Sequence, residues 1–175
     1  MNEGSRRIDR IRDPAYVDGM ADRDLEEIRA LREECLAERE YLSLLRRLVQ
    51  GRAEILKAEL DARASDEDQG PLVDRLAGIL AGDEQVGSGR GEALRIGVPE
   101  EEMLLARRSI ERLVADAGIS DPQTLADDEL AEAVEILARE EQTVSGSRAA
   151  VITVLDTVQD ELKRRYKEDP TRVLQ

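Results

Sequence analysis

Several residue types are scarce or missing in this chain of 175 residues. It has no His, Trp or Phe, three Tyr and a single Cys. Without His, and with one thiol, the chain has little with which to build a transition-metal site or a paired nucleophile and base. The lone Cys35 excludes a disulfide framework and fits a small core residue. We therefore expect a protein that is not an enzyme and holds neither metal nor cofactor.

Positive charge and long apolar runs are also scarce. The chain carries 26 basic residues against 40 acidic ones, a net charge of -14. Contacts to nucleic-acid phosphates need clustered Lys and Arg, so we expect no direct DNA binding. No run of about 18 apolar residues occurs, and the N-terminus lacks the apolar core of a signal peptide. These absences predict a cytoplasmic protein without membrane association.

Helical periodicity dominates what is present. Apolar residues recur at three- and four-residue steps from Leu25 to Leu60 and, more regularly, from Leu130 to Leu162. In the second stretch the seam is apolar except at Glu141 and Arg148. Each apolar stripe is too narrow to stabilise a helix alone, so the two helices should pack together. The predicted fold is all-α: an antiparallel two-helix coiled coil with short helices inserted between the long helices.

Pro, Gly and charge patterns suggest five segments. A mobile or weakly docked N-terminal arm covers 1–21, the first long helix covers 22–65, and the second covers 127–169. The part between them, 66–126, is a loop and short-helix insert with helices expected at about 71–80 and 99–118, and residues 170–175 form a tail.

Polar residues recur beside both apolar seams. A shift of 102 residues moves Ser43 onto Ser145 and Arg46 onto Arg148, and places Glu54 on Asp156. An Arg can donate two hydrogen bonds to O6 and N7 of guanine, and a carboxylate can accept from guanine N1 and N2. The same residues could also be ordinary flanking residues of a coiled coil that form salt bridges. Both readings stay open on the residues alone.

The polar pattern resembles a family signature. Glu-x3-Ser-x2-Arg-x3-Gln-x3-Asp, approximated once on each long helix, is similar to the signature of the actinobacterial RsiG family, anti-sigma factors once called aerial mycelium formation proteins. The stretch SLLRRLVQGRAEILKAEL at 43–60 carries the closest local similarity. The resemblance implies an antiparallel coiled coil that binds cyclic di-GMP, as a stacked dimer, and with it holds a WhiG-type sigma factor away from RNA polymerase in the control of sporulation.

The resemblance also implies a set of ligand-binding residues. Cyclic di-GMP would be a regulatory ligand and not a cofactor. Carried over by position, the residues are Arg39, Ser43, Arg46, Gln50, Glu54, Glu141, Ser145, Arg148 and Asp156.

Three positions depart from the signature. Arg39 stands where the first copy should have Glu, Glu54 replaces Asp, and Ile152 replaces Gln in the second copy. Glu54 can accept the same hydrogen bonds, whereas Ile152 cannot and Arg39 reverses the charge. Two alternatives therefore remain: an acidic coiled-coil adaptor that binds no nucleotide, and an anti-sigma factor that no longer depends on the ligand.

Overall fold

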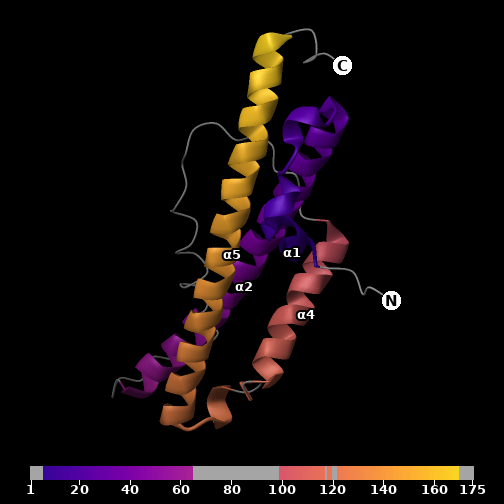
Figure 1. Cartoon of the computed structure of the whole chain (residues 1–175). Coiled ribbons are helices and arrows are strands. Elements are labelled where there is room, and N and C mark those ends of the chain that lie inside the picture. The colour runs from indigo at the N-terminus through magenta and orange to yellow at the C-terminus, as the bar shows by residue number, and fades with distance from the viewer. Residues whose placement is uncertain (1–5, 65–98, 117, 120–121, 170–175) are drawn as a thin grey trace. The chain divides into compact units, whose positions relative to one another are not determined.

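The structure, a computed structural model, describes residues 6–64, 99–116, 118–119 and 122–169. Figure 1 shows that this part of the chain contains helices and connecting turns, with no strand. In order, the helices are α1 (Arg7–Arg12), the 3-10 turns η1 (Pro14–Tyr16) and η2 (Met20–Asp22), α2 (Leu25–Ala64), α4 (Glu100–Asp116), the 3-10 turn η4 (Pro122–Thr124) and α5 (Asp127–Glu168). The helix expected at 71–80 lies outside the described residues.

The chain forms two compact units that share the long helices. Unit 1 comprises Met1–Ser43 and Thr143–Gln175, and unit 2 comprises Leu44–Gln142. Unit 1 thus holds the first half of α2 and the second half of α5, whereas unit 2 holds the remaining halves together with α4. In each unit the two half-helices run antiparallel, as the contacts below show.

Burial along both long helices follows a seven-residue period. This spacing is the one that keeps a seam facing a partner helix in a coiled coil. The buried residues on this period are Ile28, Cys35, Leu42, Val49 and Leu56 in α2, and Leu130, Leu137, Val144, Val151 and Val158 in α5. The shift of 102 residues places each member of the first series on a member of the second. The predicted all-α coiled coil is confirmed.

The core of unit 2 combines three helices. Val49 and Leu56 of α2 pack with Leu130 and Leu137 of α5, and Val114 of α4 closes the cluster. The helix α4 ends where Gly118 adopts a left-handed conformation with φ of +69°. The amide of the next residue, Ile119, then donates to the carbonyl oxygen of Val114 at 2.9 Å, an arrangement that terminates many helices.

In unit 2 the end of α2 binds the turn that precedes α5. Arg63, in the last turn of α2, donates from Nη1 to the carbonyl oxygen of Leu125 at 2.7 Å and from Nη2 to that of Pro122 at 3.0 Å. Its Nε donates to the carboxylate of Glu59, one turn earlier, at 3.0 Å. These contacts place the C-terminal end of α2 beside the start of α5, so the helices are antiparallel.

In unit 1 the end of α5 repeats this arrangement atom by atom. Arg165 donates from Nη1 to the carbonyl oxygen of Arg23 at 2.7 Å and from Nη2 to that of Met20 at 2.6 Å. Its Nε donates to Glu161 at 2.6 Å. Arg165 and Glu161 are the residues that the shift of 102 gives for Arg63 and Glu59. The internal repeat therefore extends beyond the polar residues beside the seams to the ends of the two long helices.

The described part of the N-terminal segment, expected to be mobile or weakly docked, contacts α2. Ile11 is buried, and Arg7 pairs with the carboxylate of Glu38 on α2 at 2.5 Å. The Tyr16 hydroxyl donates to the carbonyl oxygen of Leu31 at 3.2 Å. Burial raises the pKa of this hydroxyl, with further contributions from Cys35 and Glu34. The local pattern could not predict the docking, because Glu38 is an acceptor 31 residues away.

The first long helix begins with a reciprocal cap formed by Asp24 and Glu27. Glu27 N donates to Asp24 Oδ1 and Asp24 N donates to Glu27 Oε2, both at 2.8 Å. This reciprocal pair is a capping box, which satisfies two backbone N–H groups at the helix start. The second long helix has half of it, since Ala126 N donates to Glu129 Oε2 at 2.8 Å but alanine cannot reciprocate.

Candidate functional site

In unit 2 three of the predicted site residues meet across the helices. Arg46 Nε of α2 lies 2.5 Å from Glu141 Oε1 of α5, and Gln50 Nε2 donates to the same oxygen at 3.3 Å. Arg46 and Gln50 are one turn apart on the same side of α2, so both reach one carboxylate. The Arg46 side chain is 39% exposed and that of Glu141 is 22% exposed. We call these three residues the unit 2 set.

In unit 1 the corresponding contacts use a hydroxyl. Arg148 Nε of α5 donates to Ser43 Oγ of α2 at 2.9 Å, and Ser43 Oγ donates to the carbonyl oxygen of Arg39 at 2.7 Å. The Arg39 side chain pairs with its neighbour Glu40 at 2.7 Å. Within the described part of the chain, no carboxylate pairs with Arg148. Arg39, Ser43, Arg148 and Ile152 are the unit 1 set.

The two sets are unequal for a reason that the internal repeat makes clear. Under the shift of 102, the pair Arg46 and Glu141 of unit 2 corresponds to Arg148 and Arg39 in unit 1. Two cations cannot form that pair, and Arg148 bonds Ser43 instead. Gln50 corresponds to Ile152, which has no donor. Both departures from the signature therefore fall on the same set, although they lie on different helices.

The other predicted site residues stand apart from these contacts. Glu54 and Asp156 are exposed, and Ser145 is half-buried. Among the residues that the structure describes, the side chains of Glu54 and Ser145 have no hydrogen-bond partner. Asp156 is near enough to Lys163 to contribute to the raised pKa of that ammonium, although Asp160 is the larger cause. Their role in binding a ligand stays a prediction.

Both sets can act as hydrogen-bond donors to an incoming group. Only the Nε of Arg46 and the Nε of Arg148 take part in the contacts above, so the terminal N–H groups of both guanidiniums remain available. A guanidinium presents its N–H groups in a fixed plane that matches the O6 and N7 edge of guanine or two phosphate oxygens. Half-burial strengthens such contacts relative to bulk water.

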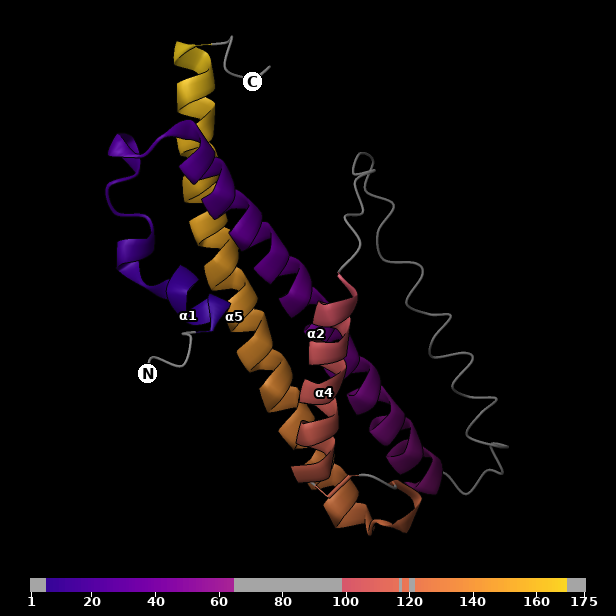
Figure 2. The same cartoon turned by 90° about the vertical axis from the view of Figure 1, so that its right-hand side faces the viewer.

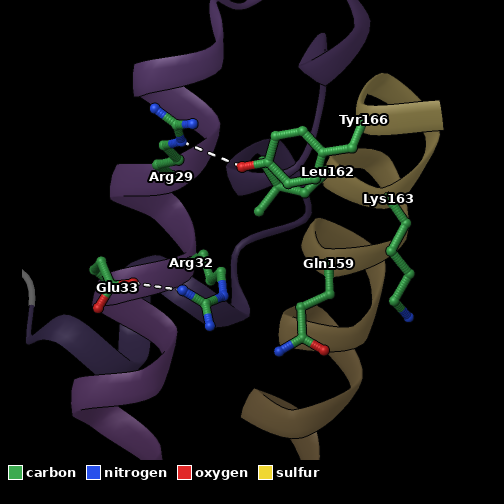
Figure 3. Close-up of a pocket in the computed structure, with 7 residues that line it drawn as sticks. All are labelled: Arg29, Arg32, Glu33, Gln159, Leu162, Lys163 and Tyr166. Carbon is green, nitrogen blue, oxygen red and sulfur yellow. Dashed lines mark hydrogen bonds and ion pairs between the residues drawn. The ribbon is translucent and has the colours of Figure 1, made fainter. Parts of the chain in front are cut away.

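A groove in unit 1 was not expected from the sequence. It measures about 570 Å³ and is lined by Arg29, Arg32, Glu33, Gln159, Leu162, Lys163 and Tyr166. Figure 3 shows Arg29 of α2 directed at the Tyr166 hydroxyl of α5, to which its Nε donates at 3.2 Å. The groove forms where residues that are 137 positions apart in the sequence meet, so no local sequence pattern predicts it.

Each cationic residue of this groove forms an ion pair with a nearby carboxylate of its own helix. Arg29 pairs with Glu26 at 2.5 Å, Arg32 pairs with Glu33 at 2.7 Å, and Lys163 pairs with Asp160 at 2.9 Å. An anion would have to displace these neighbours to bind. Figure 3 shows the Arg32 and Glu33 pair within the groove itself. We therefore assign no ligand to it.

The described residues lack two further features. None of their helices combines the length and the apolar character that a membrane span requires. The same residues include no group of three or more His, Cys, Asp or Glu side chains placed to hold a metal ion.

The fold and the two sets define a helical protein whose polar side chains pair across its long helices. Comparison with known families adds one match. A family model described as RsiG-like matches residues 14–80, a stretch that contains the whole first copy of the polar pattern, from Arg39 to Glu54. No curated protein matches the chain. The RsiG-like match over this stretch confirms the resemblance drawn from its residues.

Proposed function

We propose that this protein is an anti-sigma factor that binds cyclic di-GMP through the motifs on its two long helices. With the ligand bound, it sequesters a WhiG-type sigma factor from RNA polymerase. The observation that carries the proposal is the pairing of motif residues across α2 and α5, Arg46 with Glu141 and Arg148 with Ser43. The RsiG-like match over the first motif copy supports it.

Guanine recognition follows from the chemistry of each set. In unit 2, Arg46 donates to the O6 and N7 edge, and a carboxylate accepts from N1 and N2. Glu141 is already placed beside Arg46, and Glu54 lies exposed two turns beyond it on α2. In unit 1, Arg148 performs the donation and exposed Asp156 supplies the carboxylate. A stacked dimer of cyclic di-GMP provides guanines for both sets.

Regulation follows from linkage between the two partners. A ligand that lies against both this protein and the sigma factor adds surface to their interface, so each partner strengthens the binding of the other by the same factor. The net charge of -14 favours encounter with basic surfaces of a sigma factor and makes the association rate sensitive to salt. When cyclic di-GMP falls, the sigma factor is released.

The decisive experiment measures equilibrium binding of labelled cyclic di-GMP to the full chain. GTP and cyclic di-AMP serve as competitors, and the double variant Arg46→Ala/Arg148→Ala is measured beside the native chain. We expect competition by neither nucleotide and a loss of affinity of at least about 100-fold in the variant, since two charge-assisted guanine contacts are removed.

A control variant with the same change in net charge separates recognition from bulk electrostatics. Arg107→Ala/Arg139→Ala removes two exposed guanidiniums outside the motifs, and circular dichroism verifies the helical content of both variants. Equal loss in both double variants would overturn guanine recognition. Pull-down of purified sigma factor with and without cyclic di-GMP then tests the partner.

A second candidate function is favoured by one contact. Arg46 and Glu141 satisfy each other's charge across the helices, as flanking residues of a coiled coil do without any ligand. This favours a ligand-independent anti-sigma factor or an acidic adaptor. For either, the Arg46→Ala/Arg148→Ala variant should bind its protein partner nearly as well as the native chain.

A further inference from the structure

A groove in unit 2 lies between α2 and α4, apart from the polar sets. It measures about 640 Å³ and is lined by Arg47, Leu48, Gly51, Arg52 and Ile55 of α2 and by Ile110, Glu111 and Val114 of α4. In Figure 2 α4 crosses in front of α2. Val114 belongs to the core cluster with Val49 and Leu56, and Ile110 packs against that cluster. The volume is within the range of small-molecule sites, about 300–1,000 Å³.

The walls of this groove are apolar and its charges lack partners. Leu48, Ile55 and Ile110 supply aliphatic surface. Neither Arg47 nor Arg52 forms an ion pair with any residue that the structure describes. The Nε of Arg52 is shielded from solvent and has no hydrogen-bond acceptor. A shielded N–H without a partner is costly, so an acceptor supplied by a ligand would recover that cost.

Gly51 gives the groove its depth. It lies in the middle of α2, where glycine is less favourable than alanine by about 1 kcal/mol. A Cβ atom at this position would meet nothing within 4 Å. Helix packing therefore does not require a glycine here, and a larger side chain would fill the groove between Arg47 and Ile55. A ligand that occupies the space beside Gly51 would explain why the helix has a glycine at this unfavourable position.

We propose that the groove between α2 and α4 binds a small amphipathic carboxylate, with its apolar body along Leu48, Ile55 and Ile110 and its carboxylate on Arg52 and Arg47. The two guanidiniums outnumber the single carboxylate of Glu111, so an anionic head is preferred over a cationic one. The site is separate from guanine recognition and does not depend on the function proposed above.

The test uses decanoate, below its critical micelle concentration, and the full chain in isothermal titration calorimetry. Decan-1-ol and decyltrimethylammonium are the uncharged and cationic probes. We expect decanoate to bind about tenfold more tightly than decan-1-ol, because a charge-assisted hydrogen bond adds to the same apolar burial. We expect the cation to bind more weakly than the alcohol.

Two substitutions locate the binding. Gly51→Met adds a side chain whose Cβ meets nothing within 4 Å, and it improves helix propensity, so it should abolish binding of decanoate while the chain stays folded. Gly146→Met on α5, also without a neighbour within 4 Å, makes the same chemical change outside the groove and should leave binding intact. Arg52→Gln should weaken decanoate about tenfold and leave decan-1-ol unchanged.

Several results would overturn the proposal. Equal affinities of the three probes would mean indiscriminate binding to apolar surface. Retained binding of decanoate in Gly51→Met would show that the probe binds elsewhere. Failure of the native chain to bind decanoate would show that the groove does not bind such a carboxylate, and would favour an apolar segment of another protein as its occupant.

Discussion

The two units share one frame and differ in the polar residues that it holds. Arg63 in unit 2 and Arg165 in unit 1 use the same three nitrogen positions to bind two backbone carbonyls and a glutamate. In contrast, Arg46 meets a carboxylate and an amide, whereas Arg148 meets only a hydroxyl. The scaffold residues therefore pair alike in both units, whereas the residues of the two sets do not.

This difference distinguishes residues that hold the fold together from residues that are available to bind a ligand. The equivalent arginines at the helix ends hold a neighbouring turn against a helix by hydrogen bonds. Loss of these hydrogen bonds would therefore destabilise the unit directly. The polar sets lie beside a seam that is already buried at seven-residue steps, so they can change without loss of the fold. Arg39 and Ile152 can therefore differ from the signature without loss of the fold.

The largest effect is expected from truncating the cores. Leu56 lies in a cluster of seven buried residues in unit 2, whereas Leu162 lies in a cluster of three in unit 1. Each Leu→Ala change should cost about 2–5 kcal/mol in the free energy of unfolding, with Leu56 the more costly because more neighbours lose contacts. Urea denaturation followed by circular dichroism measures both. A larger loss for Leu162→Ala would reverse the ranking of the two cores.

The helix-end contacts should come next. Arg165 is 8% exposed at its side chain, and Arg63 is 24% exposed. Arg165→Ala should therefore cost about 2 kcal/mol, because it removes the hydrogen bonds to the carbonyl oxygens of Met20 and Arg23 and one of the two arginines that pair with Glu161. Arg63→Ala should cost less. Hydrogen exchange should show faster exchange near η2 in the first variant and near η4 in the second, and a swapped pattern would refute the assignment.

A moderate effect is expected from making the two sets alike. Arg39→Glu/Ile152→Gln gives unit 1 the residue types that pair in unit 2. If the unit 1 set limits ligand affinity, cyclic di-GMP should bind about tenfold more tightly, because an ordered Arg148 gains a carboxylate and an amide as neighbours. Competition binding measures this. The matched change Glu141→Arg/Gln50→Ile should weaken binding, and no change in either variant would show that the asymmetry is irrelevant to the ligand.

The smallest effect concerns acid stability. Hydrogen bonds from Arg164 and Arg165 lower the pKa of Glu161 from 4.5 to about 2. A carboxyl whose pKa is lower in the folded state stabilises the fold fully above its ordinary pKa, and this contribution is lost as pH falls from about 4.5 towards 2. Thermal unfolding across this range should show a shallower acid decline for Glu161→Gln than for the native chain. Identical declines would contradict the coupling.

The periodic spacing of apolar residues predicts most of the fold. The seven-residue apolar spacing and the capping pair of Asp24 and Glu27 predict long helices, because both depend on residues within a few turns of each other. The docking of the N-terminal segment escaped prediction. Its contacts, such as that of Arg7 with Glu38, join residues far apart in sequence, and charged residues there read as solvent-exposed.

The sequence by itself determined which residues repeat and where the copies differ. The shift of 102 residues, the arginines at 46 and 148 and the substitutions at 39 and 152 are all legible without coordinates. Only the tertiary structure decided which of them meet, because pairing across antiparallel helices depends on register and not on spacing within a helix. Register places Arg46 beside Glu141 and Arg148 beside Ser43, and the packing of α4 on α2 forms the groove at Gly51.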